Sequence, residues 1–303
     1  MPTLYTRADS NIRKTWLYLT GFLVFIIFLG WLISYLVESS IILWVAVIYS
    51  LLASFLSYWY SDKIVLALSG AKLIEKKDNP NLYRLVENLC IAAGLPLPRI
   101  YIINESQPNA FAAGRNPKHS VLAVTKGLLL RLEKSELEGV LAHELSHIGN
   151  RDALLQAMVV VLVGVVVIIT DIFLRISFWR GLSGRDSNRQ SGNIGVFLMI
   201  IGLVLALLAP FFATLIKLAI SRKREFLADA AGALLTRYPE GLARALDKIS
   251  KDPNPLKTAN SSTAHLFFSS PFRGKRSKSW FSKLFMTHPP VEERIKALLD
   301  MKT

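Results

Sequence analysis

Long apolar segments constrain this chain more than any other feature of its sequence. Residues 16–36 and 41–60 contain no charged side chain, and a helix needs about 20 residues to cross the hydrocarbon core of a bilayer. Because only a short connection separates these two segments, we expect a tight helical hairpin that spans the membrane. Two further apolar segments, 153–174 and 194–216, predict a second hairpin within residues 153–220, either spanning or re-entrant.

Basic residues indicate how the first hairpin is oriented. The tail 1–15 carries three of them, whereas the connection between the first two apolar segments carries none. Because Lys and Arg collect on the cytoplasmic side of membrane proteins, we expect the tail to be cytosolic, together with residues 61–152 and 221–303. Four arginines lie between the second pair of apolar segments: Arg175, Arg180, Arg185 and Arg189. Four basic residues are unfavourable in an external loop, because Lys and Arg collect on the cytoplasmic side. The re-entrant alternative therefore stays open.

The charge balance alone would suit a nucleic-acid-binding protein. The chain has 36 Lys and Arg against 22 Asp and Glu, a net charge of +14, yet 52% of its residues are hydrophobic and its mean hydropathy is +0.37. A disordered chain or a soluble basic protein would be poorer in apolar residues. We therefore expect a membrane protein with its charges in separate segments, and no nucleic-acid partner. The single cysteine, Cys90, excludes an intrachain disulfide and is expected to be buried.

The two cytosolic segments, 61–152 and 221–303, together suffice to bury a core. Helical periodicity covers residues 81–94, and alternation of apolar and polar residues predicts three short strands, at 99–104, 109–115 and 119–125. The fold class expected from these patterns is a multi-pass α-helical membrane protein with a cytosolic α+β domain.

A capped helix is expected to follow the strands. Ser135 and Glu138 form the Ser-x-x-Glu pattern of a capping box, which predicts a helix from Glu136. This helix contains His143-Glu144-Leu145-Ser146-His147. Two His four residues apart lie on one face of a helix and can reach the same tetrahedral zinc ion, while Glu144 is placed to take a proton from water. The pattern predicts a zinc peptidase.

A catalytic zinc ion takes three protein ligands, so one more is needed. The positions that would supply it in a longer motif on this helix hold Asn150 and Ala153, and the third ligand must therefore come from elsewhere. A hairpin that enters and leaves at one membrane face would return Glu225 to the zinc helix, with Asp229 holding a ligating His by its other ring nitrogen. His265 and His288 are rival third ligands, whereas His119 is expected to be solvated or hydrogen-bonded.

Four motifs make the chain similar to a known family. They are HELSHIGNRD, SRKREFLADAAGA, PNAFAAGR and THPPVEERI, and they occur together with the four apolar segments. In this combination the sequence resembles the HtpX-like membrane zinc endopeptidases, relatives of the CAAX-prenyl endopeptidases, over nearly its whole length. The resemblance implies a zincin-like (gluzincin) peptidase domain and one zinc ion (Zn2+) per chain. It also implies hydrolysis of misfolded or damaged membrane proteins, a role in quality control and the stress response.

The same resemblance implies roles for individual residues. His143, His147 and Glu225 would bind the zinc ion, and Glu144 would act as general base and then as general acid. Asp229 would remain the carboxylate that supports a ligand.

Two further segments would contact the substrate by this resemblance. Asn109, Ala110 and Phe111 would form an edge strand that pairs with the substrate backbone, the alternative being an ordinary interior strand. His288, which precedes two prolines, would donate to the oxyanion or to substrate carbonyls, the alternative being a residue that only precedes the last helix. Arg294 on that helix is expected to form a structural ion pair.

The expected location is the plasma (inner) membrane of a prokaryotic cell, with the active site facing the cytoplasm. The expected partners are the lipid bilayer and membrane-protein or unfolded polypeptide substrates. Residues 272–285 mix basic and aromatic side chains, which predicts either contact with anionic lipid head groups or a solvated loop. The alternative of a different class is a non-catalytic membrane scaffold on the same fold, which would predict a broken zinc motif.

Overall fold

The structure is a computed structural model, and it describes residues 4–37, 39–162, 222–254, 256, 266–269 and 289–301. Several predictions lie outside the described residues. These are the segment 194–216, most of the segment 153–174, the arginines between them, His265, His288 and residues 272–285.

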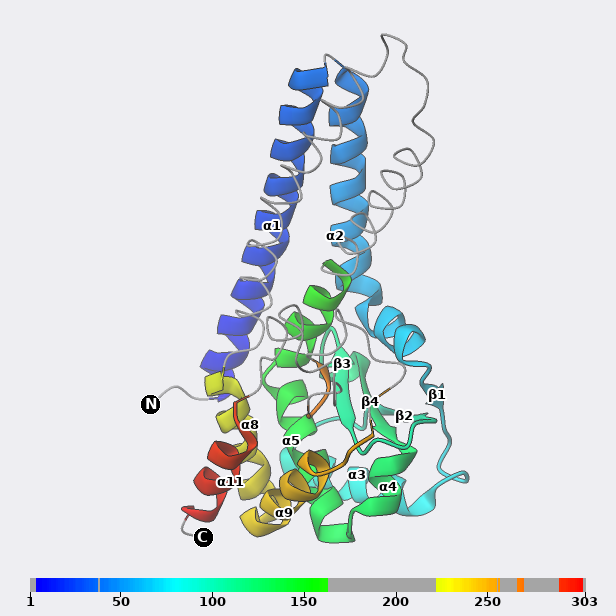
Figure 1. Cartoon of the computed structure of the whole chain (residues 1–303), viewed down its shortest axis with the longest axis vertical. Helices are drawn as coiled ribbons and strands as arrows, with labels where there is room; N and C mark the ends of the chain where they lie inside the picture. Colours follow the sequence, from blue (N-terminus) through cyan, green and yellow to red (C-terminus); the bar gives the residue numbers. More distant parts are fainter. Residues whose placement is uncertain are drawn as a thin grey trace, which may run out of the picture.

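Two long helices form the predicted first hairpin. α1 (Leu4–Val37) and α2 (Ser40–Ser69) run antiparallel, side by side, and project away from the rest of the described chain (Figure 1). Both are long and apolar enough to cross a membrane. Large apolar side chains point away from the protein on both helices, among them Trp31 and Trp44. At Gly30 a Cβ atom would lie 2.2 Å from the Cβ of Ala46, so only glycine allows the helices to approach this closely.

Both helices extend beyond the apolar segments 16–36 and 41–60. α1 already begins at Leu4, so most of the tail 1–15 is helical, with Asn11 and Thr15 buried. α2 continues past residue 60 and ends only at Gly70, which has a φ of 64°. The backbone of a helix keeps its hydrogen bonds outside the bilayer until a residue such as this glycine ends it. The peptidase domain is therefore joined to the hairpin through continuous helix.

A four-stranded sheet lies below the hairpin. Its order is β1 (Lys72–Leu73), β2 (Arg99–Ile103), β4 (Ser120–Thr125) and β3 (Ala110–Gly114), with β2 and β4 parallel and β3 antiparallel to β4. The three longer strands confirm the predicted ones to within one residue at every end. β3 is an edge strand of this sheet.

Both faces of the sheet are buried. On β3 and β4, Ala112 and Leu122 belong to one apolar cluster, whereas Phe111 and Val121 belong to another. The first cluster includes α3 (Pro80–Ala93) and α5 (Lys134–Gly149), and the second includes the lower end of α2 and the helical segment Asp152–Leu162. The sheet is thus packed between the helix that carries the HExxH motif and the foot of the membrane hairpin, by which we mean the C-terminal end of α2 around Val65 and Leu66.

Four further α-helices lie in the described residues: α4 (Lys126–Arg131), α8 (Arg222–Thr236), α9 (Pro239–Ser250) and α11 (Val291–Leu299). α8 and α9 pack against α5, and α11 packs against α8 and α9. Two glycines allow close packing: a Cβ at Gly232 of α8 would lie 3.0 Å from the backbone nitrogen of His143, and one at Gly139 would lie 2.9 Å from the backbone of Leu242. α8 therefore lies directly against the HExxH helix.

The predicted start of α5 was wrong by two residues. The helix begins at Lys134, and its capping pair is Glu133 and Glu136, where the Glu133 backbone N–H donates to Glu136 Oε2 at 2.9 Å. The predicted Ser135–Glu138 pair therefore lies inside the helix, which is two residues longer at this end than predicted. The helix expected at 81–94 is confirmed as α3, and Cys90 in it is buried, which raises the pKa of its thiol to about 11.

Candidate metal centre and active site

The two histidines of the HExxH motif lie one turn apart on α5 and face the same point. Their Nε2 atoms are 3.2 Å apart, with ring planes at 86°. Only 1% of His143 and 4% of His147 is exposed. The helical spacing places both imidazoles on the side of α5 that α8 covers.

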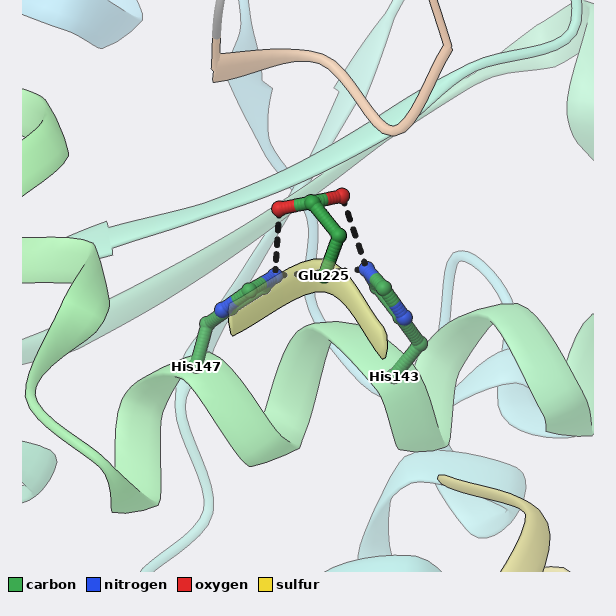
Figure 2. Close-up of side chains that lie close together, drawn as sticks. All are labelled: His143, His147 and Glu225. Carbon is green, nitrogen blue, oxygen red and sulfur yellow. Dashed lines mark hydrogen bonds and ion pairs between the residues drawn. The ribbon is translucent and has the colours of Figure 1, made fainter. Parts of the chain in front are cut away.

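Glu225, in the first turn of α8, completes a group of three (Figure 2). Its Oε2 lies 3.9 Å from His143 Nε2, and its Oε1 lies 3.6 Å from His147 Nε2. Ligand atoms about 2.0–2.1 Å from a tetrahedral zinc ion lie roughly 3.3 Å from one another. Two imidazoles and one carboxylate at these separations fit a divalent zinc ion, so the predicted convergence of Glu225 on the HExxH helix is confirmed.

A carboxylate orients each imidazole from behind. His143 Nδ1 lies 2.9 Å from Asp229 Oδ1, and His147 Nδ1 lies 3.2 Å from Asp152 Oδ2. When Nδ1 donates its proton to a carboxylate, the lone pair of Nε2 is directed at the metal position. Asp229 was predicted for this position, whereas Asp152 was not.

The two histidines differ in proton affinity. Burial lowers the pKa of His143 to about 4, which leaves it neutral at pH 7. Burial also acts to lower the pKa of His147, but the hydrogen bond to Asp152 and the charge of Glu225 outweigh it and raise that pKa to about 9. A metal ion binds the neutral ring, so metal binding has to displace a proton from His147.

Arg294 of α11 joins two of these carboxylates. It is 1% exposed, and its Nε and Nη2 donate to the two oxygens of Asp229 at 2.8 and 2.7 Å. Its Nη1 lies 3.8 Å from Glu225 Oε2. Although burial by itself would raise the pKa of Asp229, the charge and hydrogen bonds of Arg294 lower it overall, and Asp229 stays ionised. The geometry agrees with the structural ion pair expected of Arg294.

Asn11 and Asp152 support the site, and the sequence revealed neither of them. Asn11 Nδ2 on α1 donates to Asp152 Oδ1 at 2.7 Å and to the Asn150 carbonyl at 2.8 Å. Arg151, which precedes Asp152 in the chain, has a φ of 61°. The chain therefore turns sharply after α5, and this turn brings Asp152 back to His147. The sequence did contain one signal for Asp152, since an aspartate stands five residues after His147, the second His of the motif. The membrane hairpin therefore reaches a metal-site histidine through one carboxylate.

Removing that carboxylate tests its importance. Because Asp152 fixes the ring of His147, Asp152→Asn is expected to weaken zinc binding about 10–100-fold, the usual effect of losing a hydrogen-bond partner of a metal ligand. Competition with a chelator of known affinity measures the change. Asp247→Asn on α9, where the side chain is about half exposed, is the matched control and should bind zinc as the unchanged chain does. Equal affinity of both variants would contradict the role of Asp152.

Glu144 is the one acidic residue of the HExxH motif. It is 2% exposed, and burial raises its pKa to about 7, while the charge of His147 and a hydrogen bond from the Ala112 backbone act to lower that pKa. Ala112 lies on β3, so this edge strand and α5 together position the carboxylate. A carboxylate with a pKa near neutrality can both accept and release a proton at pH 7.

The predicted substrate strand has an occupant from its own chain. On the outer edge of β3, the Ala110 carbonyl accepts from the Phe268 backbone N–H at 2.9 Å, and Asn109 exchanges hydrogen bonds with the Ser269 backbone at 2.9 and 3.2 Å. The ring of Phe268 lies 4.9 Å from that of His143. The sequence patterns did not indicate that residues 266–269 lie here. His119 is exposed and bonded to Asn116, as expected.

Comparisons with known proteins identify relatives that are peptidases, in agreement with the metal centre described above. The model of peptidase family M48 matches residues 76–302, more than half of the chain. The chain belongs to peptidase family M48. It is 44% identical over 303 residues to the "Protease HtpX homolog" of Caldanaerobacter subterraneus, with 99% of this chain and 98% of that protein covered. Proteins of the same description from Dictyoglomus turgidum and Pyrococcus furiosus are each 46% identical, covering 99% and 93% of this chain and 95% and 91% of their own.

A solved structure, the crystal structure of S. mikatae Ste24p, aligns with 90% of this chain and 62% of its own at 21% identity, with a TM-score of 0.49. The family and the HtpX homologues confirm the predicted resemblance and the predicted enzyme class: the chain is a membrane metallopeptidase. With the HExxH motif intact, the alternative of a non-catalytic scaffold has no support.

Proposed function

We propose that this M48 peptidase is a zinc-dependent endopeptidase that cleaves misfolded or damaged membrane proteins at the cytosolic surface of the membrane. The observation that carries the proposal is the group formed by His143, His147 and Glu225, with Glu144 beside it. Two His and one Glu are the protein ligands of a catalytic zinc site that keeps one position open for water.

The chemistry follows from the residues around that position. A bound zinc ion would supply a Lewis acid that polarises the scissile carbonyl and acidifies a water molecule. Glu144 accepts a proton from the attacking water as its oxygen bonds to the carbonyl carbon. The same carboxyl group then gives this proton to the nitrogen as the C–N bond breaks, which leaves a carboxylate product and an amine. Asp229 and Asp152 keep both imidazoles in place throughout.

An extended substrate is proposed to lie along β3. The outer edge of a sheet can bind a peptide through backbone hydrogen bonds. The Ala110 carbonyl faces outward on this edge, as its hydrogen bond from the Phe268 backbone N–H shows. Ala112 on the same edge contacts Glu144. A substrate strand that pairs at Ala110 must therefore displace Phe268, and its backbone would pass next to the catalytic carboxylate. His288 remains a proposed contact to substrate carbonyls.

The substrate class rests on how close the site lies to the bilayer. Asp152 contacts His147 on one side and Asn11 on the other. Asn11 precedes the apolar segment 16–36 by five residues, which is about 7.5 Å along a helix. Loops and ends of membrane proteins, or unfolded segments next to the membrane, are the polypeptides that reach such a site. The cytosolic orientation rests on the basic residues of the tail.

The test is cleavage of an unfolded model membrane protein by the purified full chain in detergent, with and without a chelator. Zinc removal is expected to abolish cleavage, and added zinc should restore it. His143, His147 and Glu225 form one group of ligands, so restoration should need about one equivalent of zinc per chain. Cleavage that persists after the metal has been removed would overturn the proposal.

A further inference from the structure

A basic cavity lies at the foot of the membrane hairpin, on the side of the sheet away from the metal site. Its volume is about 720 Å³, and its walls come from the lower part of α2, from β2 and from the connection between β3 and β4. A neighbouring cavity of about 530 Å³ shares two lining residues with it, Arg115 and Lys118. None of the metal-site residues lines either cavity.

The cavity carries an excess of positive charge. Lys63, Arg99, Arg115 and Lys118 line it, together with one carboxylate, that of Asp62. Asp62 pairs with Arg99 at 2.9 Å. Within the described ranges, no carboxylate forms an ion pair with the other three cations. Three positive charges that converge on one cavity, with no carboxylate paired to them in the described part of the chain, fit an anionic ligand.

Aromatic rings of α2 form one wall of the cavity. Trp59 and Tyr60 are the last residues of the apolar segment 41–60, and both are more than 40% exposed. The guanidinium of Arg115 lies 4.6 Å from the ring centre of Trp59, and the ammonium of Lys63 lies 5.0 Å from that of Tyr60. Trp and Tyr collect at the level of the lipid head groups. The cavity is therefore open where the hydrocarbon core ends.

We propose that this cavity binds the head group of an anionic phospholipid. Arg and Lys are the residues that bind phosphate oxygens, and basic pockets beside membrane helices on the cytosolic side bind lipid phosphates. The exposed aromatic wall suits a phosphate whose acyl chains run back along α2. A free phosphate ion shares the charge but makes no use of the apolar wall.

The expected strength follows from the number of cations. Each Lys or Arg near an anionic lipid surface contributes about five-fold to binding. Replacement of two of the three unpaired cations is therefore expected to weaken binding about 25-fold. The pair Arg115→Gln and Lys118→Gln is the sharpest choice, because both residues line both cavities and neither contributes to the apolar core.

Native mass spectrometry of the full chain in detergent tests the proposal, with phosphatidylglycerol, phosphatidylcholine and inorganic phosphate as probes. The Glu144→Gln variant serves as background, so that the outcome does not depend on the proposed peptidase activity. We expect phosphatidylglycerol to bind at least about ten-fold more tightly than phosphatidylcholine, and the double variant to lose that preference. The control variant, Lys76→Gln with Lys251→Gln, loses the same amount of positive charge at exposed sites outside the cavity. It should keep the preference for phosphatidylglycerol.

Three results would overturn the proposal. The double variant could bind phosphatidylglycerol as tightly as the control does. The two lipids could bind equally to the unchanged cavity. Inorganic phosphate could bind at the same concentration as phosphatidylglycerol does and compete with it, which would make the cavity a site for free phosphate. Should the double variant fail to fold, as judged by its thermal unfolding, Lys63→Gln replaces it, with an expected five-fold loss.

Discussion

Replacement of Glu144 by glutamine is expected to reduce kcat about 10²–10⁴-fold while the zinc content stays at about one ion per chain. Glutamine has the size of glutamate but cannot accept the proton of the attacking water. Glu144 is not one of the three side chains that converge on the metal position, so its loss leaves the ligand set intact. Cleavage rate and metal content, measured on the same sample, check both parts.

The matched control for this prediction is Glu138→Gln. Glu138 lies on the same helix, at the surface, with about a third of its side chain exposed, and its only described ion pair is a 4.0 Å contact with Lys134. This variant should cleave as the unchanged chain does. Loss of zinc from a folded Glu144→Gln variant would show that Glu144 is a ligand, and unchanged kcat would show that another group moves the proton.

The largest expected effect on metal content comes from Glu225→Ala. Two imidazoles alone hold zinc poorly, and a variant without the third ligand should bind it at least about 100-fold more weakly than the unchanged chain. Metal analysis after dialysis is expected to find far less than one zinc ion per chain, with activity lost in proportion. Because Arg294 keeps its two hydrogen bonds to Asp229, the variant should still fold.

The control for Glu225→Ala is Glu240→Ala, which removes an exposed carboxylate from the first turn of α9. It should retain full zinc content, and circular dichroism should show the same helix content for both variants. Full zinc occupancy in Glu225→Ala would contradict the ligand assignment. It would redirect attention to His265 and His288, the alternatives that the sequence left open.

Much of the fold was predictable because its patterns are local. The charge-free segments gave the membrane hairpin, and alternation gave strands β2 to β4. The His143–His147 spacing on a helix is also a local property, since i and i+4 positions share a face in any α-helix. The full length of α1 and α2 could not be predicted in this way, because an apolar segment marks only where a helix can cross lipid, whereas the helical hydrogen bonding continues beyond it.

The supporting residues of the site could not be predicted in the same way. Asn11 and Asp152 are 141 positions apart, and Asp229 and Arg294 are 65 apart. No spacing rule connects such pairs, because their contact depends on how α1, α5, α8 and α11 pack. The occupation of the β3 edge by Phe268 was likewise hidden, since residues 266–269 have no periodicity of their own.

The sequence by itself determined which groups carry the chemistry, because HExxH fixes two imidazoles and a carboxylate on one helix face. It also determined that the chain is attached to a membrane. Only the tertiary structure decided that Glu225 reaches both imidazoles and that Asp152 and Asp229 hold them from behind. It also decided that Lys63, Arg115 and Lys118 meet at one cavity beside α2. The physical reason is that buried charges need partners from other elements, and packing alone determines which elements meet.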